Sequence, residues 1–135
     1  MNATALNLSI WQPRVLGILR IVAGLLFLSH GLVKVFGFPV GAQPGQQILL
    51  SLMGVGGLIE LLCGLLIVVG IFTRPAAFIA SGETAFAYWM FHAPKSFFPV
   101  INQGDAAILF CFVFLYLSVA GPGDFALARR PKPEA

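Results

Sequence analysis

The chain has 135 residues, of which 59% are hydrophobic and 10% are charged, with a formal net charge of +3 and a mean hydropathy of +0.93. A water-soluble domain carries about 25% charged residues, so this composition excludes an ordinary soluble fold and indicates a lipid environment. The basic residues form no stripe interleaved with aromatic residues, which argues against nucleic acid as a partner.

We expect one all-helical membrane domain at residues 14–121. It lies between an N-terminal segment at 1–13 and a C-terminal tail at 122–135. The N-terminal segment does not resemble a secretory signal peptide, because it lacks a basic start and the apolar run after it contains no small-residue cleavage site. We therefore predict that this first apolar run is kept as a membrane span.

Four apolar stretches in turn predict four transmembrane helices, since about 20 helical residues cross a hydrocarbon layer roughly 30 Å thick. The predicted spans are 15–36, 48–72, 75–92 and 106–120. The connections between them are short, and the longer ones contain Pro and Gly. Short connections favour an antiparallel up-down four-helix bundle.

Glycines recur every seven residues in the first two spans, at Gly17, Gly24 and Gly31 and then at Gly57 and Gly64. Lipid tails give helices little hydrophobic reason to associate, so helices in a membrane meet where small residues allow close approach. The pattern predicts a tightly packed bundle rather than a wide pore. A glycine-rich face of this kind also suits a homodimer.

The basic residues divide unequally between the two sides of the predicted domain. Five lie on the side of the termini and two on the other side, Arg14, Arg74, Arg129, Arg130 and Lys132 against Lys34 and Lys95. Loops that carry more Lys and Arg stay in the cytoplasm. This predicts that both termini are cytoplasmic.

Three ionisable residues fall inside the predicted spans, namely Arg20, Glu60 and Glu83. An ionisable group at the bilayer centre costs about 2.5–3.5 kcal/mol on insertion scales, so each needs a partner or a function. Both carboxylates lie near mid-span, and Arg20 lies roughly 9 Å from the middle of its own span. We predict a buried cluster of the three. It either fixes the helix register as an ion pair, with one glutamate protonated, or handles protons.

A second polar group gathers at the other ends of the spans. Its members are His30, Lys34, Tyr88, His92, Lys95, Asn102 and Asp105. They are either interfacial side chains and loop caps, or a site for a polar head group, a quinone carbonyl or a small anion. On a regular helix His92 lies nearly opposite Glu83, so we expect these two to act at different places. A further alternative is a metal site of His30, His92 and Asp105, although no local ligand motif supports it.

Cys63 and Cys111 each stand alone in an apolar run, which favours two buried thiols over a disulfide between helices. The sequence contains no motif for haem, flavin or an iron–sulfur cluster, and no P-loop or dinucleotide fingerprint. The cofactor therefore stays open, with a bound quinone as the candidate.

Several blocks in chain order resemble the DoxX family. They are RIVAGLLFLSHGLVK at 20–34, ELLCGLLIVVGIFTRP at 60–75, GETAFAYWMFHAPK at 82–95, FPVINQGD at 98–105 and GPG at 121–123. The resemblance covers roughly residues 14–127. Asp105 stands where the family often has Glu, and DFAL at 124–127 replaces a Ser-Leu-Asp ending.

This resemblance implies a four-helix protein of the bacterial inner membrane, similar to the small membrane subunit of thiosulfate:quinone oxidoreductase. It also implies a link to membrane redox complexes and thiol stress, although a fold does not fix a function. The leading hypothesis is a membrane subunit or partner of a quinone-, thiol- or sulfur-linked redox system, which needs a soluble or membrane redox partner protein. The alternatives are a small transporter or a lipid- or solute-binding protein, and a scaffold that assembles other membrane proteins. Whether the chain is an enzyme is left open.

Overall fold

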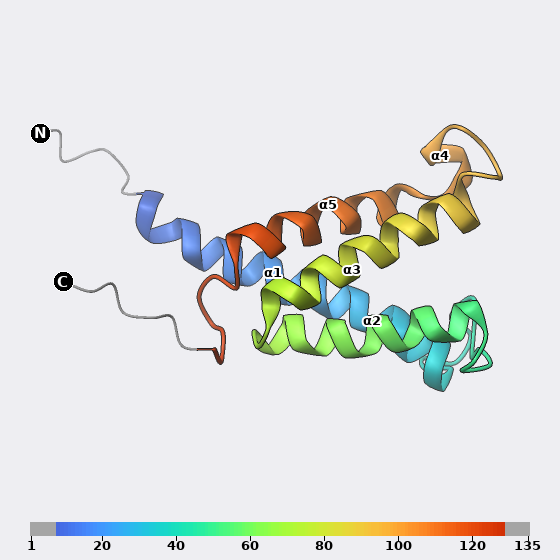
Figure 1. Ribbon diagram of the computed structural model, residues 1–135, viewed down its shortest axis with the longest axis horizontal. Helices are drawn as coiled ribbons and strands as arrows, with labels where there is room; N and C mark the ends of the chain where they lie inside the picture. The colour runs from blue at the N-terminus through green and yellow to red at the C-terminus, as the bar shows by residue number, and fades with distance from the viewer. Residues whose placement is uncertain (1–7, 129–135) are drawn as a thin grey trace, which may run out of the picture.

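The computed structural model describes residues 8–128, so 1–7 and 129–135, with the basic residues Arg129, Arg130 and Lys132, lie outside the described residues. Residues 8–128 form helices and no strands, which confirms the all-helical prediction (Figure 1). The elements are α1 (Leu8–Phe36), α2 (Leu52–Val69), α3 (Thr73–Ala87), the π-helix η1 (Tyr88–His92), the short α4 (Pro99–Asn102) and α5 (Asp105–Ala120).

The helices depart from the predicted spans mainly at their ends. α1 begins seven residues earlier than predicted and runs through Pro13. α2 begins four residues later than predicted, because the Ser51 hydroxyl accepts a hydrogen bond from Gly54 N at 3.1 Å and caps the helix there. It ends at Gly70, whose φ of 78° is the left-handed conformation that terminates many helices.

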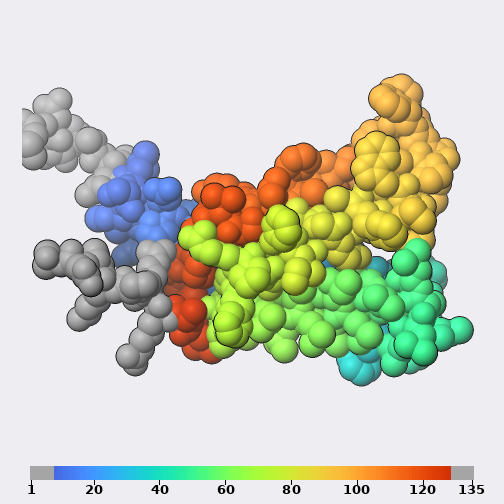
Figure 2. Space-filling view, viewed as in Figure 1, coloured from blue at the N-terminus to red at the C-terminus, as the bar shows by residue number. Residues whose placement is uncertain are grey.

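Each long helix runs back along the one before it (Figure 1). α1 and α2 are joined by the loop 37–51, α2 and α3 by a short turn, and η1 and α5 by the segment 93–104 that contains α4. We call the end where α1 begins and α5 finishes the terminal end, and the opposite end the loop end. Figure 2 shows α2, α3 and α5 side by side on one face of the molecule.

The predicted glycine contacts hold α1 against α2. A side chain at Gly31 would meet the backbone of Leu61, and one at Gly24 would meet Val68. Gly64 lies in the same way against the backbone of Leu28. The glycines therefore bring the two backbones into direct contact, as small residues do between helices in membranes.

The hydrophobic core fills the half of the molecule nearer the terminal end. Its largest apolar members, Phe27, Ile67, Phe114 and Leu117, are 0–1% exposed. Three alanines of α3, Ala76, Ala77 and Ala80, let that helix pack closely against them. The rings of Phe27 and Phe114 meet edge to face at 4.8 Å between centroids.

The surface is apolar, and the interior holds charged and polar side chains beside the hydrophobic core. Large apolar side chains point outward from all the long helices, for example Val22 of α1, Leu62 of α2, Phe78 of α3 and Phe112 of α5, which are 49–65% exposed. The buried side chains include charged and polar ones: Arg20, Glu60, Thr73, Ser81, Thr84 and Asn102. α1 and α2 are each long and apolar enough to cross a membrane. This is the distribution of a membrane protein.

Arg20 closes the terminal end. Its side chain is fully buried and donates hydrogen bonds to carbonyl oxygens of α2 and of the segment after α5, those of Ile67, Val68, Pro122, Asp124 and Phe125. The segment 121–128, predicted to begin a tail, lies across this end and bonds to α1 through Asp124 N and Pro13 O at 2.8 Å. One guanidinium thus joins three parts of the chain.

Candidate ligand-binding site

A cavity of about 600 Å³ opens in the half of the molecule nearer the loop end. Its ionisable lining residues come from α1, α2, α3, η1 and the loop that follows: His30, Lys34, Glu60, Glu83, His92 and Lys95. Small-molecule sites typically measure about 300–1,000 Å³ and place a few polar groups among apolar walls. The cavity therefore has the size and the lining of a ligand site.

A buried ion pair lines the cavity. Lys34 Nζ is 2.6 Å from Glu60 Oε1, and the two side chains are only 11% and 6% exposed. Gly57 makes room for the pair, because a side chain there would meet the Lys34 stem. A lysine from the end of α1 can therefore reach a carboxylate halfway along α2.

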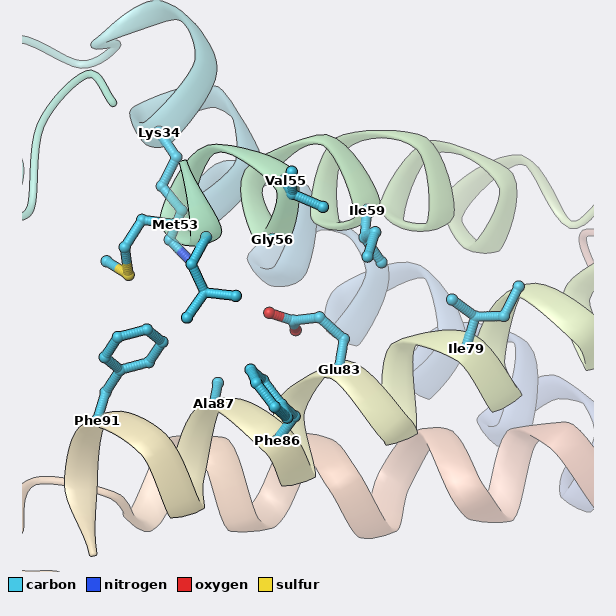
Figure 3. A pocket seen from close by; sticks show the side chains of 11 residues that line it. Lys34, Met53, Val55, Gly56, Ile59, Ile79, Glu83, Phe86, Ala87 and Phe91 are labelled. Carbon is cyan, nitrogen blue, oxygen red and sulfur yellow. The ribbon is translucent and has the colours of Figure 1, made fainter. Parts of the chain in front are cut away.

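Two carboxylate oxygens in the cavity have no hydrogen-bond partner. They are Glu60 Oε2 and Glu83 Oε2, and both are buried. The Glu83 carboxylate points from α3 toward α2 (Figure 3), where a Cβ at Gly56 would lie 3.2 Å from its Oε1. Buried polar atoms are almost always hydrogen-bonded, so these two oxygens are available to a proton or to a polar ligand.

In both histidines Nδ1 donates a hydrogen bond to a backbone carbonyl, which leaves Nε2 as the acceptor. His30 Nδ1 lies 2.8 Å from Leu26 O, and His92 Nδ1 lies 3.0 Å from Asn102 O. A carbonyl oxygen only accepts, so Nδ1 carries the hydrogen in each ring and donates it. In the neutral ring Nε2 is then left to accept a hydrogen bond.

The π-helix η1 places His92 beside the cavity. Ala93 N donates to Tyr88 O at 2.9 Å, the i→i+5 bond of a wide turn. On a regular helix, at about 100° per residue, His92 would lie opposite Glu83. The wide turn absorbs one residue, which brings His92 to about 80° from Glu83. The prediction that these two residues act at different places is therefore wrong, because both line one cavity.

Aromatic rings form the walls and the floor of the cavity. Phe27 and Phe110 lie between the cavity and the core, and Phe110 stacks on Phe114 with 5.5 Å between centroids. Phe91 lines the side toward α2 and α3. The polar groups thus face a largely apolar chamber that ends at a packed aromatic floor.

The comparison with protein families decides what kind of chain this is. The family model for DoxX matches residues 15–93, more than half of the chain. The chain belongs to the DoxX family. This confirms the resemblance read from the sequence. Five of the six ionisable residues of the cavity lie within the matched range, and only Lys95 falls beyond it.

A relative of this DoxX protein is an uncharacterized protein of Haemophilus influenzae. The two are 38% identical over 128 residues, which cover 92% of this chain and 96% of the relative. No solved structure matches the chain. The family membership therefore supports a membrane protein and leaves the chemistry to be argued from the site.

The predicted Arg20–Glu60–Glu83 cluster is wrong in one member. Glu60 and Glu83 do line one cavity of this DoxX protein, but their cation is Lys34. Arg20 is used at the terminal end, where its donors are taken by backbone carbonyls. The reason is that a guanidinium with five donors can satisfy several carbonyls at once, whereas one lysine ammonium suits a single carboxylate.

The predicted residues of the loop end divide between the cavity and its support. His30, Lys34, His92 and Lys95 line the cavity, whereas Tyr88, Asn102 and Asp105 do not. Asn102 is 1% exposed and organises the loop, because its Nδ2 donates to Ser96 O at 2.8 Å and its Oδ1 accepts from Gly104 N at 2.8 Å. Tyr88 stacks on His92 at 6.3 Å between centroids. These two residues therefore hold the wall in place.

The metal site of His30, His92 and Asp105 is wrong. Within residues 8–128 no group of three His, Cys, Asp or Glu side chains could hold a metal ion. Asp105 is exposed in the first turn of α5 and does not reach the cavity. An acidic residue there interacts favourably with the helix N-terminus, which accounts for its presence.

Both cysteines are free thiols, as expected, but only Cys63 is buried as predicted and Cys111 is half-buried. Cys63 is buried in the core, and Cys111 Sγ lies 3.6 Å from Ser81 Oγ where α5 meets α3. The sequence analysis did not identify Gln43 and Gln103, which lie at the loop end of the cavity. They lie in different loops, and only the fold brings them together.

Proposed function

We propose that this chain is a four-span protein of the bacterial inner membrane that binds a quinone between its helices and serves as the membrane subunit or partner of a thiol- or sulfur-linked redox system. The family, the apolar surface and the charged cavity support this proposal. The observation that carries it is the cavity, in which a buried Lys34–Glu60 pair and two unpartnered carboxylate oxygens face aromatic walls.

The lengths and the surface of the helices support four spans in an up-down bundle. α1 and α2 are each long and apolar enough to cross a membrane, and α3 continues into η1 to give one helical run at 73–92. α5 is apolar along 16 residues, and its outward-facing Phe112 is 63% exposed. A soluble bundle would carry charged residues at such positions, so lipid is the solvent that fits all four helices.

The chemistry of the lining suits a quinone head group. Lys34 Nζ is a donor that a quinone carbonyl can accept from, and the aromatic walls suit a flat ring. Glu60 and Glu83 are placed to hold protons. A quinone takes up two electrons and two protons on reduction, and the electrons would come from a dithiol or sulfur compound that a partner protein oxidises. The role of this chain is to bind, to orient and to supply protons.

The test is to purify the full chain from its native membranes and to extract its lipids. We expect isoprenoid quinones enriched over the bulk membrane, measured by mass spectrometry. Glu83→Gln should reduce the bound quinone, whereas Asp105→Asn, an exposed acid-to-amide change outside the cavity, should not. A quinone content equal to that of the bulk membrane would contradict the proposal. Unchanged quinone reduction in membranes that lack the protein would contradict the redox partnership.

A second candidate is a binding protein for a small anionic solute. The observation in its favour is that Lys34 and Lys95 both line the cavity, with Gln43 and Gln103 at the loop end. Binding of short carboxylates or phosphate that quinones do not displace would favour it. Transport fits less well. Alternating access needs helix interfaces that move, whereas the glycines pack α1 closely against α2.

A further inference from the structure

A groove of about 240 Å³ lies between α2 and α3 (Figure 3). Of the 11 residues that line it, only Lys34 and Glu83 have polar side chains. Its outer rim consists of apolar side chains that are between 44% and 52% exposed, Leu52, Val55, Ile79 and Phe86. The groove therefore opens on the apolar surface of the molecule, between α2 and α3.

The groove and the charged cavity meet. Both are lined by Lys34, Met53, Glu83, Ala87 and Phe91. Gly56 and Ala87 leave the passage open because their side chains are small, and the Glu83 carboxylate points into the space between the two helices (Figure 3). An apolar opening on the surface thus leads to the charged groups.

We propose that this groove is a lateral opening to the bilayer, which holds the hydrocarbon chain of a single-chained amphiphile whose polar head occupies the cavity. The proposal rests on the proposed function for the identity of the head. It adds the place of the chain and the route of entry, from the membrane between α2 and α3 rather than through the loops.

The size and the lining of the groove select this occupant. At 240 Å³ the groove is smaller than the roughly 300–1,000 Å³ of a complete small-molecule site, which suits one part of a ligand. An apolar lining gives a water-soluble ligand few hydrogen bonds, whereas it packs well against methylene groups. Lys34 and Glu83 lie where the groove meets the cavity, so the polar head of the amphiphile enters first and the hydrocarbon chain stays in the groove.

The experiment compares two benzoquinones with the same dimethoxy-methyl head, one without a chain and one with a decyl chain. Binding to the full-length protein in lipid nanodiscs is measured for the wild type, for Val55→Trp and Ile79→Trp on the two walls of the groove, and for Val22→Trp. Val22 is the matched control, since it is 49% exposed on α1, close to the 44% of Val55, and lines neither hollow.

We expect both groove variants to lose about tenfold or more in affinity for the decyl quinone and to bind the unchained quinone normally, because an inserted indole competes with the chain for one space. Val22→Trp should bind both quinones like the wild type. Normal binding of the decyl quinone by both groove variants would overturn the proposal, and so would an equal loss of both ligands. If the wild type binds neither quinone, the proposed function fails as well.

Discussion

Lys34 and Glu60 form a buried ion pair, and each side chain is positioned by the other. A buried ion pair adds little net stability, since desolvation offsets the attraction, but removal of one partner leaves an uncompensated charge at a cost of roughly 3–5 kcal/mol. Here the pair also lines the cavity, and Glu60 Oε2 has no hydrogen-bond partner. The site is therefore sensitive to any change that alters the count of charges.

We predict that Lys34→Met destabilises the protein most at high pH. At high pH Glu60 is then a buried carboxylate without a cation, whereas at low pH it takes up a proton and the penalty disappears. Thermal unfolding in detergent at pH 8 and pH 5 measures both states. The double variant Lys34→Met/Glu60→Gln should recover most of the loss at pH 8. A single variant as stable as the wild type at both pH values would contradict the role of the pair.

The sequence analysis placed Glu60 and Glu83 together but assigned them Arg20 rather than Lys34 as the cation. The depth of a residue in its own predicted span does not show which residues of a neighbouring helix lie level with it. Gly31 lies against Leu61, so Glu60 is level with the last turns of α1. Arg20 is then eleven residues away, roughly 16 Å at 1.5 Å per residue, and Lys34 is within one turn.

At the scale of an element, η1 is a local insertion into an otherwise regular helix. A π-turn accommodates one extra residue in an α-helix and is frequent at functional sites. Neither the apolar pattern of 75–92 nor its composition marks such a turn, so the sequence could not place His92 on the side of Glu83. The turn becomes visible only in the bond from Ala93 N to Tyr88 O.

We predict that deletion of Met90 is tolerated. Met90 is 49% exposed, and its removal turns the wide turn into a regular one while His92 keeps its direction. Deletion of Gly82, an exposed residue in the regular part of α3, should instead rotate every following residue by about 100° and abolish ligand binding. Binding of the decyl quinone and the helical circular dichroism of both deletions check this. Equal behaviour of the two deletions would show that η1 does not set the position of His92.

We predict opposite effects for two glycine-to-alanine changes. In Gly31→Ala the new Cβ would lie 2.5 Å from Leu61 N, so α1 and α2 must separate, at a cost of roughly 1–3 kcal/mol. Gly82→Ala meets nothing within 4 Å and should stabilise by up to about 1 kcal/mol through helix propensity. The unfolding midpoints measure both. A Gly31→Ala protein as stable as Gly82→Ala would show that α1 and α2 are not in close contact.

At the scale of the whole molecule, the sequence predicts the all-helical architecture well, because each apolar run is long enough to be read without tertiary information. It does not predict the cavity. Ala76, Ala77 and Ala80 allow close packing in one half of α3, whereas Glu83 and Ala87 face an open space in the other half. Whether a helix face meets a neighbour or a hollow depends on the other helices, and no local pattern records that.

The orientation of the molecule is a prediction of its own. Arg14 and Arg74 lie at the terminal end, whereas Lys34 at the loop end is neutralised by Glu60. We predict that green fluorescent protein fused after residue 135 fluoresces in the cytoplasm, and that alkaline phosphatase inserted in the loop 37–51 is active outside it. The reverse pattern would contradict the proposed topology.

The closed terminal end has an electrical consequence. A polar hollow that crossed the whole bilayer would leak ions and discharge the membrane potential. Here the hollow stops at the ring of Phe27, and beyond it the fixed positive charge of Arg20 repels cations. Each 100 mV is worth about 2.3 kcal/mol per elementary charge that crosses the full field. A proton that moves between the solvent outside the loop end and Glu83 crosses only part of that field. The proposed proton chemistry therefore opens no path for ions across the whole membrane.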